Sequence, residues 1–122
     1  MKVLIVDDSV AMSKAASLLV TKAGHEVITA ENGYRALQVI EREVPDLVFL
    51  DVEMPVLDGF KTCMLIRERF SKEELPIMFL TSHGTVFDQA RGRMAGGVGF
   101  VVKPFNGNRI NEVLAEWGGN SE

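Results

Sequence analysis

Residues 3–8 read VLIVDD, an apolar run that ends on the carboxylates of Asp7 and Asp8. Three later runs have the same form, at residues 47–51 (LVFLD), 77–81 (IMFLT) and 100–103 (FVVK). Short apolar runs of this kind are typical of strands that are buried on both faces, as in a parallel sheet. Ligands of open α/β sheets bind beyond the carboxyl ends of the strands. We therefore expect the four polar endings to surround one pocket.

Helical patterns separate these runs. A further strand is predicted at 26–30, and apolar residues fall at helical offsets in five segments, namely 12–23, 36–40, 63–66, 86–94 and 110–117. The connections are too long for hairpins, so the pattern predicts a (βα)₅ chain with a parallel sheet and right-handed crossovers. Glycines at 84, 92, 96 and 97 surround or interrupt the fourth helix. We expect that helix to be the least stable.

Composition excludes several classes of protein. A chain of 122 residues, 47% hydrophobic and 25% charged, fits one globular domain over 1–122. The net charge of −4 and the absence of a basic run disfavour nucleic-acid binding. The single cysteine, Cys63, permits no internal disulfide and is expected in the core, as are the methionines at 12, 64, 78 and 94. No signal peptide or membrane span is apparent, so a cytoplasmic location is expected.

The polar endings stand in short motifs, which are Asp7-Asp8-Ser9, Asp51 with Met54-Pro55 and Asp58-Gly59, Thr81-Ser82, and Lys103-Pro104-Phe105. In this order they resemble the receiver domain of bacterial two-component response regulators. The resemblance extends from Lys2 to about Trp117. It implies a flavodoxin-like, doubly wound fold with strand order 2-1-3-4-5, which makes Asp7, Asp8 and Asp51 neighbours.

The resemblance also implies roles for these carboxylates. Asp51 matches the phospho-acceptor, which takes a phosphoryl group from a phosphohistidine of a sensor histidine kinase. Asp8, Asp51 and the backbone carbonyl of Glu53 match the Mg²⁺ ligands, with Asp7 acting directly or through water. Physical chemistry agrees, because three neighbouring carboxylates repel one another and Mg²⁺ prefers oxygen ligands.

Other matched positions hold and sense the phosphoryl group. Lys103 is implied to pair with one phosphoryl oxygen, aimed by a Lys103–Pro104 peptide that is usually cis in the family. Thr81 is implied to hydrogen-bond another oxygen and to draw Phe100 inward. Glu53 and His83 flank the site, where they are expected to tune the lifetime of the phosphoaspartate.

The expected output is binding of a target protein by the fourth helix, last strand and last helix, around Arg91, Met94, Phe100 and Phe105. The chain is expected to be a monomer or a phosphorylation-dependent dimer, not an enzyme that turns over external substrates, and to act without nucleic acid or membrane. Residues 58–66 and 87–93 resemble single-domain regulators of type IV pilus twitching-motility systems, and the stand-alone form resembles chemotaxis regulators.

Three alternatives remain open from the sequence. The chain is either complete or the receiver of a longer regulator with an output domain. A haloacid-dehalogenase-type hydrolase also uses a strand-end aspartate and Mg²⁺. It needs a second carboxylate two positions on in a context with threonine or valine, and residues 51–55 (DVEMP) do not fit that pattern. A phosphate-independent interaction domain is the third. Taken alone, Asp8-Ser9 is equally explained as a helix N-cap, and Asp58-Gly59 as a helix start.

Overall fold

The computed structural model describes residues 1–82, 84–104 and 106–118. Its strands are β1 (Lys2–Val6), β2 (Glu26–Ala30), β3 (Leu47–Asp51), β4 (Ile77–Thr81) and β5 (Gly99–Val102). Its helices are α1 (Val10–Lys22), α2 (Gly33–Arg42), α3 (Gly59–Arg67), α4 (Val86–Ala95) and α5 (Gly107–Gly118). Every predicted strand and helix is present. Predictions that concern His83, Phe105, the side chain of Phe87 and the tail 119–122 lie outside the described part of the chain.

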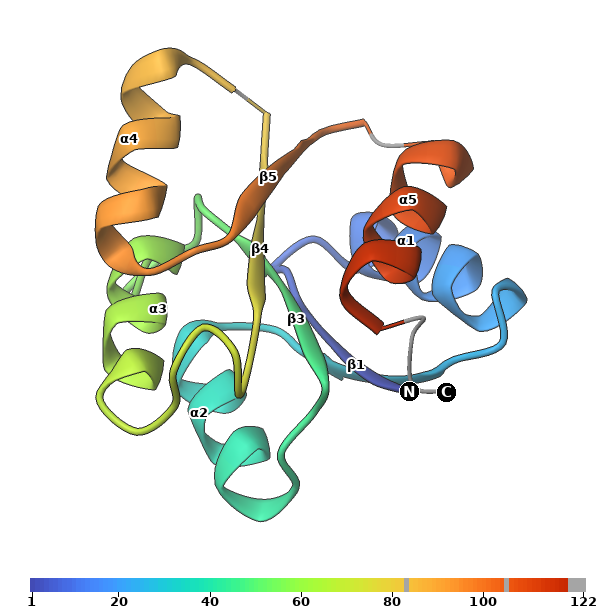
Figure 1. Ribbon diagram of the computed structural model, residues 1–122, viewed down its shortest axis with the longest axis horizontal. Coiled ribbons are helices and arrows are strands. Elements are labelled where there is room, and N and C mark those ends of the chain that lie inside the picture. Colours follow the sequence, from blue (N-terminus) through green and yellow to red (C-terminus); the bar gives the residue numbers. More distant parts are fainter. Residues whose placement is uncertain (83, 105, 119–122) are drawn as a thin grey trace.

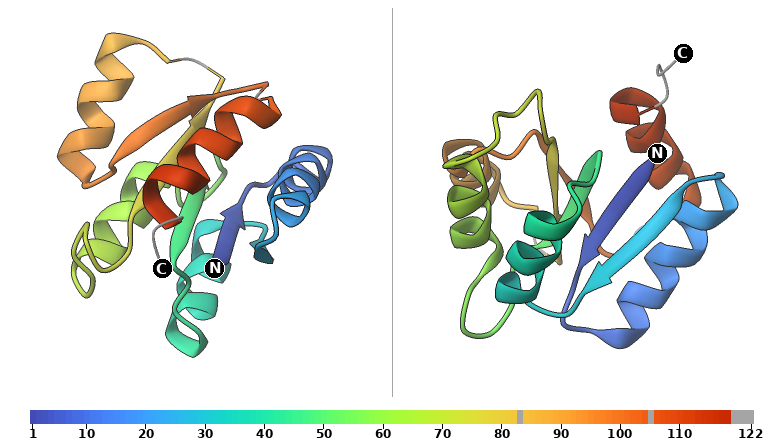
Figure 2. Two further views of the ribbon diagram at one scale, coloured as in Figure 1. Left: turned by 45° about the vertical axis from the view of Figure 1, so that its right-hand side comes forward. Right: turned by 90° about the horizontal axis from the view of Figure 1, so that it is seen from below.

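The strands form one parallel sheet in the order β2-β1-β3-β4-β5, which confirms the predicted fold class. Figure 1 shows α1 and α5 on one face of the sheet and α2, α3 and α4 on the other. The right-hand view in Figure 2 shows β1 and β2 side by side at one edge. Because β1 and β3 are neighbours, the residues that follow Val6 lie beside those that follow Leu50.

The central strands are buried on both faces, as their apolar runs predict. Along β1, Leu4 and Val6 belong to the cluster beneath α2 and α3, whereas Val3 and Ile5 belong to the cluster beneath α1 and α5. Cys63 is fully buried, and burial raises the pKa of its thiol to about 11. The core placement of Cys63 is therefore confirmed. None of the helices in the described ranges is long and apolar enough to span a bilayer.

Short polar side chains begin the helices. The Ser9 hydroxyl accepts from the N–H of Met12 at 3.2 Å and caps α1, so Asp8 is not needed as a cap. Asp58 caps α3 through the N–H of Lys61, as predicted. Asn32 caps α2 through the N–H of Arg35 at 2.7 Å.

Two predicted core positions are wrong. Met64 is 57% exposed and Met94 is 88% exposed, whereas Met78 is buried as expected. In α3, Cys63 and Ile66 share the inner face, and the next residue after Cys63 is turned about 100° away from it. In α4, the small residues Gly92 and Ala95 are buried, whereas residues 86 and 94 of the apolar stripe are exposed and residue 90 is only half-buried.

The loop after β3 contains a strained residue. Val56 has φ +72° and is 86% exposed, and the N–H of Leu57 bonds the carbonyl of Pro55 at 2.8 Å. A left-handed conformation costs a residue with a Cβ about 1–2 kcal/mol, but asparagine tolerates it well. Val56→Asn is therefore expected to raise the free energy of unfolding by about 1 kcal/mol in urea titrations. Val44→Asn is the control, because Val44 is a half-exposed loop valine without positive φ. Equal changes in the free energy of unfolding for the two substitutions would show that the backbone at Val56 is not strained.

Candidate functional site

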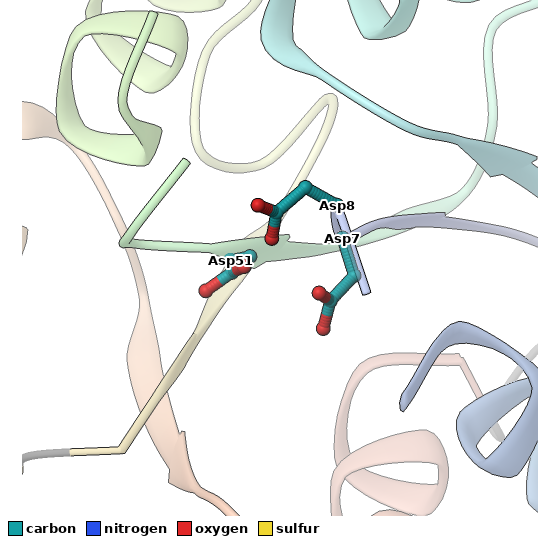
Figure 3. Close-up of side chains that lie close together, drawn as sticks. All are labelled: Asp7, Asp8 and Asp51. Carbon is teal, nitrogen blue, oxygen red and sulfur yellow. The ribbon is translucent and has the colours of Figure 1, made fainter. Parts of the chain in front are cut away.

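Three carboxylates gather at the carboxyl edge of the sheet. Asp7 and Asp8 follow β1, and Asp51 is the last residue of β3. One carboxylate oxygen from each lies within 4.8 Å of the others (Figure 3). Asp7 and Asp51 are buried, at 3% and 2% exposed, while Asp8 is exposed. The neighbouring strands β1 and β3 thus bring together the group that the sequence places at their ends.

Lys103 reaches this group from the residue after β5. Its Nζ lies 3.1 Å from Asp7 Oδ2 and 3.1 Å from Asp51 Oδ1. Burial alone lowers the pKa of Lys103, but the hydrogen bond to Asp7 and the charge of Asp51 raise it above the usual value overall. The ammonium is therefore charged at neutral pH. The Lys103–Pro104 peptide is cis, as the resemblance implies.

The pKa of the Asp51 carboxyl is strongly shifted. Burial, followed by the charge of Asp7, raises its pKa to about 7, against the attraction of Lys103 and the N–H of Glu53. That N–H donates to Asp51 Oδ1 at 3.2 Å. One ammonium thus faces three carboxylates, and the site has an excess of negative charge whenever all three are ionised.

The site fits a small hard cation such as Mg²⁺. All three candidate ligands offer carboxylate oxygens, the donors that this ion prefers. Asp7 Oδ2 is buried, and the Lys103 ammonium lies 3.1 Å from it, so this oxygen faces the interior of the carboxylate group. The bond from Glu53 N–H places the backbone of Glu53 beside Asp51, where a carbonyl ligand is expected.

Gly59 belongs to the architecture of the site, although the sequence suggests only a helix start. A Cβ on Gly59 would lie 2.2 Å from the carbonyl oxygen of Asp51, so no other residue fits there without moving the backbone. The N–H of Gly59 also bonds the carbonyl of Val52 at 3.0 Å. The first turn of α3 is thereby packed directly on the end of β3. The adjacent Asp58-Gly59 pair is the only sequence signal for this contact.

Thr81 ends β4, and Phe100 lies on β5. Thr81 is 2% exposed and lines a cavity of about 260 Å³ together with Glu53 and Arg91. Phe100 is half-buried, with its ring centroid 5.4 Å from that of Phe79. The structure therefore joins Asp7, Asp8, Asp51 and Lys103 in one cluster and places Phe100 beside a different part of the core.

Comparisons with known proteins agree with this geometry. The family model described as the response regulator receiver domain matches residues 3–115. PilG of Pseudomonas aeruginosa is 39% identical over 106 residues, which cover 87% of this chain and 78% of PilG. The probable transcriptional regulator ycf27 of Pyropia yezoensis is 43% identical over 117 residues, which cover 93% of this chain but only 47% of the regulator.

A solved structure also matches nearly the whole length of this chain. The chemotaxis protein CheY4 of Vibrio cholerae superimposes with a TM-score of 0.89 at 34% identity, covering 95% of this chain and 97% of that one. The chain therefore belongs to the family of response regulator receiver domains. Proteins of this family are signalling switches of two-component systems that bind Mg²⁺ at an acidic pocket and work with histidine kinases and downstream targets.

Proposed function

We propose that this chain is a phosphorylation-activated switch in which Asp51 accepts a phosphoryl group from a phosphohistidine of a sensor histidine kinase. The observation that carries the proposal is the bridging Lys103 ammonium, 3.1 Å from both Asp7 and Asp51. A buried carboxylate beside a fixed cation and two further carboxylates provides a nucleophile, a site for the phosphoryl charge and a site for Mg²⁺.

In the proposed reaction, a carboxylate oxygen of Asp51 bonds to phosphorus as the P–N bond to the donor imidazole breaks, and the imidazole leaves with the bond's electron pair. Asp7, Asp8, Asp51 and the carbonyl of Glu53 would hold Mg²⁺, which when bound neutralises charge on the phosphoryl oxygens. Lys103 pairs with one phosphoryl oxygen as a point charge. Thr81 hydrogen-bonds another oxygen, and Phe100 repacks in response.

The output surface is formed by α4, β5 and α5. Its apolar stripe on α4 is exposed, with Val86 at 81% and Met94 at 88%. Arg91 and Arg93 are exposed on the same helix, and Arg109 on α5 is partly exposed. A target that supplies apolar side chains flanked by carboxylates fits this surface. The similarity to PilG and CheY4 supports a stand-alone, chemotaxis-like receiver over 1–122. A twitching-motility pathway and a cytoplasmic location are part of the proposal.

One alternative has an observation in its favour. Because the chain spans less than half of the ycf27 regulator, it is equally described as the receiver part of a longer response regulator. The phosphoryl chemistry is the same in both cases. The length of the native gene product distinguishes them.

The test is to incubate the purified chain with acetyl phosphate and to measure its intact mass. We expect a gain of one phosphoryl group with Mg²⁺ and no gain when EDTA removes the metal. A chain that stays unmodified with Mg²⁺ would overturn the proposal. Sustained release of phosphate from simple phosphate esters would instead indicate a hydrolase.

Glu53 is expected to accelerate loss of the phosphoryl group, because its exposed carboxylate can orient an attacking water beside Asp51. Glu53→Ala should therefore slow the decay of the phosphorylated chain by about fivefold or less, since an exposed charge contributes about 1 kcal/mol at most. The measurement follows the phosphorylated mass after the donor is removed. Glu68→Ala, at an exposed carboxylate after α3, is the control. An unchanged decay in Glu53→Ala would contradict this role.

A further inference from the structure

Three phenylalanines from different elements form a continuous column beneath α4. Phe60 of α3 lies 5.1 Å from Phe79 of β4, and Phe79 lies 5.4 Å from Phe100 of β5, measured between ring centroids. Tilted pairs at these distances are favourable aromatic contacts. Figure 1 shows α4 beside α3 and β5, the elements that carry the two ends of the column.

Two consecutive residues of α4 contact opposite ends of this column, Arg91 at Phe60 and Gly92 at Phe100. The guanidinium carbon of Arg91 lies 4.5 Å from the centroid of the Phe60 ring. At Gly92, a Cβ would lie 2.6 Å from Phe100 Cζ, 2.7 Å from Phe100 Cε2 and 3.1 Å from Phe79 Cδ2. Carbon atoms that are not bonded do not approach to 2.6 Å. The Phe100 ring therefore occupies the volume that a side chain at position 92 would fill.

We infer that Gly92 is a positioning residue. Because it has no side chain, the Phe100 ring packs beneath α4, and the position of the ring is thereby coupled to the position of the helix. A glycine inside a helix is destabilising relative to alanine, so its presence here has to be explained by the close approach. If the ring leaves, α4 loses its support at Gly92, while Arg91 still holds the helix to Phe60.

The inference connects the two sides of the switch. Arg91 lines the same cavity as Thr81, and Gly92 contacts Phe100. Adjacent residues of α4 are therefore placed near the two side chains that are proposed to respond to phosphorylation. The functional consequence rests on the proposed function, because it needs Phe100 to move when Asp51 is phosphorylated. The packing itself does not, and it is testable in the unmodified chain.

A double-mutant cycle tests the packing. We expect Gly92→Ala to lower the urea midpoint of the wild type, and to raise it in a Phe100→Leu background, because leucine lacks the two ring atoms that collide with the new Cβ. Gly107→Ala in α5 is the control, since its Cβ would meet nothing closer than 3.4 Å and its effect should be the same in both backgrounds. A Gly92→Ala midpoint that rises equally with and without the Phe100 ring would overturn the inference.

Fluorine NMR of the chain labelled with 4-fluorophenylalanine tests the coupling, with the Phe100 signal assigned by its loss in Phe100→Leu. We expect Gly92→Ala to move this signal toward that of solvent-exposed fluorophenylalanine, and an unmoved signal would overturn the inference even if the double variant does not fold. In the wild type, acetyl phosphate with Mg²⁺ should shift the signal, and in Asp51→Asn it should not. If Gly92→Ala shifts the Phe100 signal but phosphorylation does not, the packing of the ring against Gly92 is supported. The proposed movement of Phe100 on phosphorylation is then overturned.

Discussion

Replacement of Asp51 by asparagine is expected to leave the chain unmodified by acetyl phosphate and Mg²⁺, under conditions in which the wild type gains one phosphoryl group. The amide is isosteric but lacks the nucleophilic carboxylate oxygen. The backbone bond from Glu53 to Oδ1 is compatible with an amide oxygen, so the local fold should persist. Intact-mass spectrometry and circular dichroism report the two properties separately. A phosphoryl group on Asp51→Asn would place the acceptor elsewhere.

The same substitution is expected to stabilise the metal-free chain. The folded-state pKa of Asp51 is raised to about 7, so the ionised form costs folding free energy, increasingly as the pH rises from about 4 to about 7. Asparagine stays neutral and removes that cost, which is what remains after the attraction to Lys103 has been included. The net gain should be about 1 kcal/mol at neutral pH in EDTA. Stabilisation by added Mg²⁺ should shrink correspondingly.

The control is Glu68→Gln, which neutralises an exposed carboxylate remote from the three aspartates. It should keep full phosphorylation, and its stability should change by less than about 0.5 kcal/mol. If Asp51→Asn is no more stable than the wild type in EDTA, repulsion among the carboxylates does not lower the free energy of unfolding significantly.

Arg67→Met is expected to cause the largest loss of stability, about 2–4 kcal/mol in urea titrations. Arg67 ends α3 and donates from Nε to the carbonyl of Gly96 at 2.8 Å, and from Nη1 to the carbonyls of Phe70, Ser71 and Leu75 at 3.3, 3.3 and 2.8 Å. Methionine fills a similar volume but leaves these carbonyls without the charged donor. Both the loop before β4 and the end of α4 should loosen.

Arg69→Met is the matched control, because the Arg69 side chain is 66% exposed and its contact with Glu41 is a long surface pair of 4.0 Å. Its loss should change stability by less than about 1 kcal/mol. Hydrogen exchange gives an independent measurement, since the amides of Gly96 and Gly97 should exchange faster in Arg67→Met alone. Similar losses in the two variants would show that the carbonyl contacts of Arg67 contribute little.

Much of the candidate site is predictable from the sequence because it depends on strand ends. Asp7, Asp8 and Asp51 directly follow or end buried apolar runs, and parallel strands bring such ends to one edge. The order that makes β1 and β3 neighbours came from the family resemblance, not from the apolar pattern. The pattern alone does not say which strands pair, since β1, β3 and β4 all contain continuous apolar runs that are buried on both faces.

The faces of the helices were less predictable. Met64 and Met94 are apolar and have helical spacing, yet both are exposed. Periodicity indicates that a helix has an apolar face, but the neighbouring elements decide which face is buried. In α4 the buried face is made of small residues, because the rings of Phe79 and Phe100 occupy the space where larger side chains would pack.

By itself, the sequence determined the alternation of strands and helices and the chemistry at the strand ends, because both follow from local patterns of apolar and polar residues. Only the tertiary structure decided that Lys103 bridges Asp7 and Asp51, that Gly59 lies against the backbone of Asp51, and that Gly92 accommodates Phe100. The physical reason is common to all three. Each is a contact between residues from different elements, and its geometry depends on how closely those elements approach one another.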